Sequence, residues 1–165
     1  THTLSQGFAA ITMQDHRPHI AKFKSISLLA NIHALYTAAA QHADEAIWLH
    51  EGHAVEGCHS NVFIWQNNTL ITPPVSDPLL NGVTREALLH LARNTLGWPT
   101  QEKKISTDML INADEIFLCG STKILWPITQ LDQRPVGTGL AGERWRTLFE
   151  AYRATMPCTK TVSHT

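Results

Sequence analysis

The stretch 45-EAIWLHEGHAVEGCHSNVFIWQNNTLITPP-74 decides the fold, because it contains short apolar runs separated by turn signals. Short runs rich in Val, Ile, Trp and Phe are typical of strands. Glu51-Gly52 marks one tight turn, and Asn67-Asn68 is a hairpin signal. We therefore predict consecutive strands over residues 45–50, 53–57, 60–66 and 69–74.

Helical spacing is found on both sides of this stretch. Residues 28–41 carry apolar side chains at intervals of three and four, with an alanine-rich face suited to close packing. In residues 84–97, Thr84 is a candidate N-cap and Gly97 a candidate C′ residue. We also predict helices at 107–112 and 140–155, and strands at 8–14, 114–120 and 124–132. This mixed order indicates an α/β or α+β fold.

The composition is that of a globular domain. The 165 residues are 43% apolar and 16% charged, which suffices for one domain with a core. A formal net charge of −1 gives no basic field for nucleic acid or an anionic membrane. No apolar run is long enough to span a bilayer, and the first residues lack the pattern of a signal peptide. The three cysteines (Cys58, Cys119 and Cys158) have neither zinc nor disulfide spacing, which favours a reducing, cytoplasmic location.

Lys22 and Lys24 are the first candidate site residues, because they stand directly before the apolar run of residues 28–41. The ordinary interpretation is a pair of solvated lysines. The alternative is that Lys24, which is nearer to the apolar run, is buried. Burial favours the neutral amine, whose lone pair is then free for Schiff-base chemistry.

A carboxylate and two small-residue turns are further candidates. Glu56 lies between a strand and a Gly-containing turn. The ordinary interpretation is an exposed turn carboxylate, and the alternative is a carboxylate buried near a ring nitrogen, where it would hold a proton. Residues 80–86 (LNGVTRE) run into a helix, whose N-terminus is either routinely capped or binds a phosphate. The turn 120-GSTK-123 offers further hydroxyl and N–H donors.

A metal site is disfavoured. Two histidine pairs, His16 with His19 and His50 with His53, have residues three apart, but neither lies in a clear helical pattern. No carboxylate or cysteine completes a tetrahedral set. We therefore predict no metal ligands.

Five strings bring a lysine, a carboxylate and a phosphate-binding turn together in order: 24-KSISLLANIHAL-35, 54-AVEGCHSNVFI-64, 72-TPP-74, 80-LNGVTREALLHLA-92 and 114-DEIFLCGSTKILWPI-128. Over residues 8–155 the chain resembles the class IV aminotransferases, the fold-type IV pyridoxal-phosphate enzymes. The E-G-x-x-S-N-V-F and L-x-G-V-T-R strings are specific at this spacing, and K-S-x-x-L-L is most similar to the D-amino-acid branch. The resemblance implies a barrel-like mixed sheet with flanking helices.

The resemblance also implies a set of site residues. Lys24 matches the lysine that binds pyridoxal 5′-phosphate and moves a proton at the substrate Cα, and Glu56 matches the carboxylate beside the pyridine nitrogen. Arg17 lies where related chains carry an arginine near these two residues. The remaining cofactor contacts implied are Ser60 and Asn61 at the ring edge, Leu80 against the ring, Val83 and Thr84 at the phosphate, and Ser121 and Thr122 in a second phosphate turn.

The function implied is transfer of an amino group between an amino acid, of D-amino-acid or branched-chain type, and a 2-oxo acid. An aminodeoxychorismate lyase type of enzyme is an alternative, which Asn81 before Gly82 slightly favours. A domain of this fold without catalysis is another. Related enzymes are dimers, so the resemblance implies a homodimer of the full-length protein.

The chain departs from the family pattern in several places. Related enzymes have a smaller N-terminal domain, which supplies a phosphate-binding arginine and most of the substrate-carboxylate pocket. Because this domain and a starting Met are absent, we interpret residues 1–165 as the single cofactor-binding, C-terminal domain. We expect exposed apolar surface where the other domain docks. Three further departures put the substrate in doubt: His59 in place of a serine, Leu29 in place of a branched-chain-type tyrosine, and the string Lys123-Ile124-Leu125-Trp126-Pro127 in place of Glu-Ile-Thr-Pro. We expect His59 and Trp126 to narrow or reshape the pocket.

Overall fold

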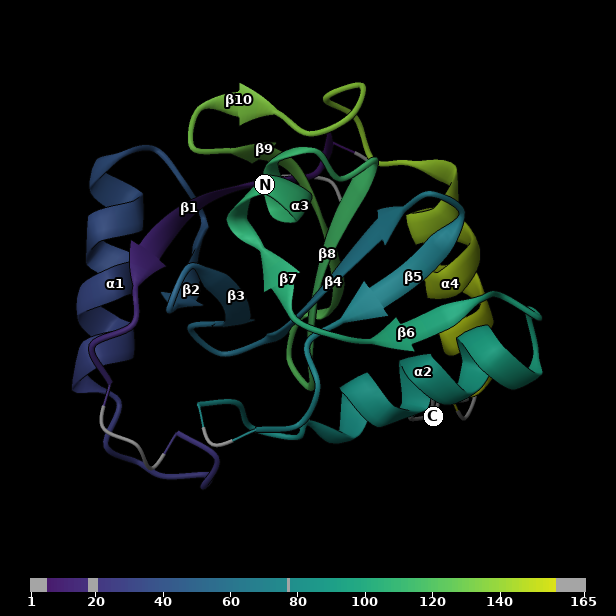
Figure 1. The fold of residues 1–165 in the computed structure, drawn as a ribbon, viewed down its shortest axis with the longest axis horizontal. Coiled ribbons are helices and arrows are strands. Elements are labelled where there is room, and N and C mark those ends of the chain that lie inside the picture. Colours follow the sequence, from purple (N-terminus) through teal and green to yellow (C-terminus); the bar gives the residue numbers. More distant parts are fainter. Residues whose placement is uncertain (1–5, 18–20, 77, 157–165) are drawn as a thin grey trace, which may run out of the picture.

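The computed structural model describes residues 6–17, 21–76 and 78–156 (Figure 1). The elements follow in the order β1 (Phe8–Gln14), α1 (Leu29–Ala40), β2 (Glu45–His50), β3 (His53–Gly57), β4 (Asn61–Gln66), β5 (Thr69–Thr72), α2 (Val83–Asn94), β6 (Thr100–Glu102), β7 (Ile105–Ser106), α3 (Thr107–Ile111), β8 (Glu115–Gly120), β9 (Ile124–Leu131), β10 (Arg134–Pro135) and α4 (Glu143–Ala154). All the predicted strands and helices are confirmed, with small shifts at their ends. The short strands β6, β7 and β10 were not predicted, because they are too short to show a period.

Six strands close into a barrel of mixed direction. Their order is β4-β8-β9-β1-β2-β3, and pairing of β3 with β4 at Glu56 and Asn61 completes the circle. β1 runs parallel to both of its neighbours, whereas the other pairs in the barrel are antiparallel. The predicted barrel-like mixed sheet is therefore confirmed.

Alternating side chains place one apolar layer inside the barrel and two outside it. In β4, Val62 and Ile64 belong to the inner cluster, whereas Phe63 and Trp65 pack outside with residues of α2 and α4. In β2, the outward-facing Trp48 packs against α1 instead. Because both faces of these strands are covered, their sequences are almost continuously apolar.

The flanking helices lie on two sides of the barrel. α1 packs against β1 and β2, and α2 and α4 pack against each other and β8 on the opposite side (Figure 1). In the described part of the chain, no helix is long and apolar enough to cross a membrane.

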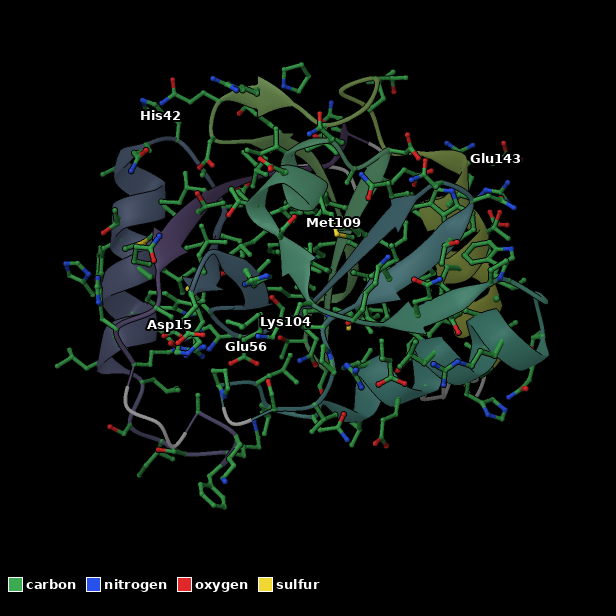
Figure 2. All side chains as sticks on the ribbon, viewed as in Figure 1. Asp15, His42, Glu56, Lys104, Met109 and Glu143 are labelled. Carbon is green, nitrogen blue, oxygen red and sulfur yellow. The ribbon has the colours of Figure 1, made fainter. Side chains whose placement is uncertain are left out.

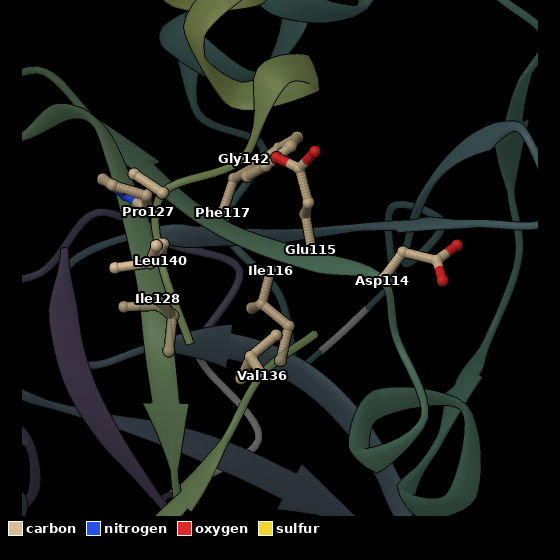
Figure 3. Close-up of a pocket in the computed structure, with 10 residues that line it drawn as sticks. Asp114, Glu115, Ile116, Phe117, Pro127, Ile128, Val136, Leu140 and Gly142 are labelled. Atoms are coloured by element: carbon tan, nitrogen blue, oxygen red, sulfur yellow. The ribbon is translucent and has the colours of Figure 1, made fainter. Parts of the chain in front are cut away.

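Helix α4 is attached to the barrel through Glu115 of β8. The Glu115 carboxylate accepts the N–H groups of Arg144 at 3.0 Å and Trp145 at 2.9 Å, so it caps the helix from another element. Gly142 must be small here, since a Cβ would lie 2.0 Å from the Glu115 carboxyl carbon. Figure 3 shows the cavity beside these residues, which at about 10 Å³ has room for about one water molecule.

The ends of α2 correct the predicted N-cap and place Gly97 one residue beyond the C′ position predicted for it, because the C-cap is Thr95. Thr84 is not the N-cap: Gly82 occupies that position in an extended conformation, and Thr84 is buried in the first turn. The helix begins earlier than predicted, with Gly82 at the N-cap. Gly82 packs directly against the Asn61 side chain, where a Cβ would lie 2.3 Å from Oδ1. Gly97 has φ +64° just past the helix, and the Trp98 N–H bonds to the Ala92 carbonyl at 2.8 Å. The predictions that concern His19 and Cys158 lie outside the described residues.

Candidate active site

A cavity of about 650 Å³ opens where the β3–β4 loop, the start of α2, the turn after β8 and the segment before α1 meet. Its wall contains all nine residues predicted to bind the cofactor: Lys24, Glu56, Ser60, Asn61, Leu80, Val83, Thr84, Ser121 and Thr122. The fold therefore brings residues from distant parts of the chain to one place. Their individual roles toward a cofactor stay predictions.

Glu56 is a buried carboxylate held by an arginine. Its side chain accepts Nη1 of Arg17 on Oε1 at 2.5 Å and the N–H of Leu80 on Oε2 at 3.0 Å. Arg17 is held in turn by Asp15, to which Nε and Nη2 each donate at 2.9 Å. Figure 2 shows Asp15 and Glu56 close together at this end of the barrel. The interpretation of Glu56 as an exposed turn residue is therefore wrong.

Burial and pairing act against each other on Glu56. Burial raises the pKa of Glu56, whereas Arg17 and the Leu80 N–H lower it, and the net shift is upward. The same contacts orient the carboxylate, because its two oxygens have different fixed donors. A buried carboxylate with an arginine partner suits the recognition of a protonated ring nitrogen.

Lys24 lies at the rim of the cavity. It is one of the lining residues, whereas Lys22 is not, and the Lys22 ammonium lies 5.5 Å from the centre of the Phe23 ring. Both lysines are exposed, so the expectation that Lys24 is buried is wrong for this chain. The physical reason is that residues 22–29 are all exposed along the open edge of the cavity.

The start of α2 forms the wall opposite this rim. Gly82 gives the helix no side-chain cap, so among the described residues no side chain caps the N–H groups of the first turn. Thr84 adds a buried hydroxyl, and the exposed Ser121 and Thr122 line the cavity from the turn after β8. Free N–H groups and hydroxyls at a helix N-terminus favour an anion such as phosphate.

The pattern of residues did not reveal a buried ion pair behind the cavity wall. Glu45 begins β2 and is fully buried, and its carboxylate pairs with the ammonium of Lys123 in the turn after β8. Asn31 was also missed, and its Nδ2 donates to the Cys58 carbonyl at 2.6 Å from α1. The only local signal for the pair was a carboxylate at the head of an apolar strand.

Of the two residues expected to reshape the pocket, His59 lines the cavity and Trp126 does not. The Trp126 ring instead stacks on Phe8, with ring centres 3.9 Å apart. Burial lowers the pKa of His59, and the nearby Lys123 and Lys24 lower it further, while Glu45 opposes them. Throughout residues 6–17, 21–76 and 78–156, no group of three or more His, Cys, Asp or Glu side chains is arranged to hold a metal ion.

Comparison with known proteins identifies the family. Residues 5–131 match the family described as Amino-transferase class IV, and the chain belongs to this family. The D-alanine aminotransferase of Bacillus licheniformis is 37% identical over 136 residues, which cover 82% of this chain and 48% of that protein. The probable branched-chain-amino-acid aminotransferase of Aquifex aeolicus is 36% identical, with 66% and 35% covered.

The fold is shared with solved structures of the same family. The crystal structure of a branched-chain amino acid aminotransferase from T.th., with pyridoxamine 5′-phosphate, has a TM-score of 0.86 at 30% identity. The match covers 92% of this chain and 51% of that one. The chain therefore spans about half the length of the T.th. and B. licheniformis enzymes.

Two buried thiols in the cavity wall give a direct test of its electrostatics. Burial raises the pKa of Cys58 to about 12, with a further contribution from Glu45, and burial raises the pKa of Cys119 to about 12. Because the thiolate is the nucleophile, we expect both cysteines to resist iodoacetamide at neutral pH and to react once urea unfolds the chain. Peptide mass spectrometry measures each site. Alkylation of either thiol at the same rate in native and unfolded protein would contradict this description.

Proposed function

We propose that this chain carries the pyridoxal 5′-phosphate site of an aminotransferase. The enzyme moves an amino group between a D-alanine-type or branched-chain-type amino acid and a 2-oxo acid. The observation that supports this most is the meeting of Lys24, Glu56 and the N-terminus of α2 around one cavity. A further relative supports the choice of cofactor: the branched-chain amino acid aminotransferase of Thermobaculum terrenum, solved in its PLP-form, is 29% identical with a TM-score of 0.83. That match covers 90% of this chain and 50% of that chain.

The residues present fit this cofactor in size and in chemistry. The cavity volume of about 650 Å³ lies within the usual range for small-molecule sites. An amine on the rim, a buried carboxylate and an uncapped helix N-terminus are the groups that an aldehyde, a pyridine nitrogen and a phosphate require. Gly82, at the N-cap, makes no side-chain hydrogen bond to the first turn of α2.

The roles of the residues follow from these positions. When bound, pyridoxal 5′-phosphate supplies an aldehyde carbon and a ring that withdraws electrons from the substrate Cα. The Lys24 amine would hold that carbon and, once the substrate amine has replaced it there, would be free to take and return the proton at Cα. Glu56, oriented by Arg17 and the Leu80 N–H, would keep a proton at the ring nitrogen. The first-turn N–H groups of α2 and the Thr84 hydroxyl would bind the phosphate.

The test is the transfer reaction itself. Chain with added pyridoxal 5′-phosphate is given D-alanine or L-leucine together with 2-oxoglutarate, and the glutamate formed is measured by chromatography. We expect transfer from at least one donor. Lys24→Ala should lower the rate by about 10²–10⁴-fold, because it removes the group that moves the proton.

Lys22→Ala is the matched control. Its side chain is exposed and outside the cavity wall, so the rate should stay within about twofold of the unsubstituted chain. If the chain binds the cofactor, forms no glutamate and releases pyruvate from aminodeoxychorismate, its activity is that of a lyase and not of an aminotransferase. Binding with neither reaction would support a non-catalytic domain, and absence of binding would contradict the proposal.

The exposed apolar surface formed by residues 23–28 and α1 supports a homodimer. Its exposed apolar side chains are Phe23, Ile26, Leu28, Leu29, Ile32 and Tyr36, as expected for a surface that another chain segment covers. α1 contains no Asp, Glu, Lys or Arg, so two such faces meet without like-charge repulsion. Apart from Asn31, His33 and Thr37, the side chains of α1 are Ala, Leu, Ile and Tyr, and such a largely apolar helix is more stable when its exposed face is also buried. We propose a second copy of the chain as the occupant.

Light scattering tests the homodimer. We expect the unsubstituted chain to form dimers and Leu29→Asp to shift it toward monomers, because a carboxylate would be buried at the contact. Leu140→Asp is the matched control, since Leu140 is also exposed but precedes α4 on the other side of the barrel. A monodisperse monomer of the unsubstituted chain would contradict this assembly.

A further inference from the structure

Lys123 connects two walls of the cavity without lining it. Its ammonium pairs with Oε2 of Glu45, and the two side chains are 12% and 0% exposed. The same carboxylate accepts the Cys58 N–H at 3.2 Å and the Ser60 hydroxyl at 3.5 Å. Through one carboxylate, the turn after β8 is thus attached to the loop between β3 and β4.

The surroundings of Lys123 fix its side chain. The ammonium lies 4.3 Å from the centre of the Trp126 ring, which itself stacks on Phe8 with ring planes 7° apart. Between a carboxylate and an aromatic face, a lysine has few alternative rotamers. The backbones of the two segments are also in close contact, since a Cβ at Gly120 would lie 3.0 Å from the His59 carbonyl oxygen.

The pairing of Lys123 with Glu45 contributes to the positions of Ser121 and Thr122. Both are exposed, and within the part of the chain that the structure describes neither hydroxyl has a hydrogen bond of its own. The next residue along the chain, Lys123, carries the buried contact of this turn. Together with the pairing of Gly120 with Ile124 between β8 and β9, the Lys123–Glu45 pair therefore holds the two hydroxyls in place relative to the start of α2.

We propose that Lys123 is a positioning residue for the anion-binding end of the cavity. By pairing with Glu45, it holds the Ser121-Thr122 turn where a phosphate group contacts both this turn and the N-terminus of α2. The inference rests on the proposed function and deepens it. Lys123, although outside the cavity wall, then contributes to the affinity for the phosphate group of the ligand and not to the affinity for its ring.

The test compares pyridoxal 5′-phosphate with pyridoxal, which lacks only the phosphate, in absorbance titrations. Lys123→Met keeps an unbranched side chain and removes the charge. We expect its affinity for pyridoxal 5′-phosphate to fall about tenfold, the effect of losing one well-placed hydrogen bond, with less than about twofold change for pyridoxal. Lys123→Arg, which keeps the charge, should restore most of the difference.

A double variant separates positioning from folding. Lys123→Met leaves the buried Glu45 without a cation and is expected to lower the urea midpoint. Lys123→Met with Glu45→Gln removes both charges, so the midpoint should recover while the preference for the phosphorylated ligand stays low. Equal losses for the two ligands, or recovery of the preference together with the midpoint, would reduce Lys123 to a structural role and overturn the proposal.

Hydrogen exchange of the ligand-free chain keeps this inference apart from the proposed function. In the double variant, we expect faster exchange in peptides covering residues 119–124 and 57–61, and unchanged exchange in α4. If the unsubstituted chain binds neither ligand, the proposed function fails, whereas faster exchange would still show that Lys123 holds the turn. Unchanged exchange in both peptides would refute the positioning role, whatever the ligand titrations give.

Discussion

The pairing of β3 with β4 at Glu56 and Asn61 closes the barrel, and the geometry of the cavity depends on it. The same two side chains bind both backbone groups of Leu80: Glu56 accepts the Leu80 N–H, and Asn61 donates to the Leu80 carbonyl. Leu80 leads directly into α2, so the bridge that completes the barrel also places the helix N-terminus. A change at either residue would therefore disturb closure and the anion-binding end together.

Buried or half-buried carboxylates mark three places where a peripheral segment meets the barrel. Glu56 meets Arg17 from the end of β1, Glu45 meets Lys123 from the turn after β8, and Glu115 meets the first amides of α4. An unpaired carboxylate in such a position would be strongly unfavourable, so each one specifies the partner that must dock there. The wall of the cavity is fixed by the first two of these contacts, and the third lies at a distance from it.

Much of this arrangement could be predicted from local patterns. Short apolar runs separated by two-residue turns indicated the barrel strands. Asn67-Asn68 forms the predicted hairpin turn between β4 and β5, with both residues at positive φ. The site residues could be found because they lie in short strings at the ends of strands and at the start of α2. The Glu45–Lys123 pair could not, because its members are 78 positions apart and the carboxylate at the head of an apolar strand does not indicate its partner. Thr84 and Lys24 were placed wrongly, since capping by Gly82 and the open rim depend on contacts between distant segments.

The most direct measurement is to find where the chain binds the cofactor covalently. The chain is incubated with pyridoxal 5′-phosphate, reduced with borohydride, digested, and analysed by peptide mass spectrometry, with Lys22→Ala and Lys24→Ala beside it. The account predicts a phosphopyridoxyl group on Lys24, unaffected by Lys22→Ala and absent in Lys24→Ala. A label on Lys22, a label spread over several lysines, or no label at all would contradict the assignment of this cavity as the cofactor site.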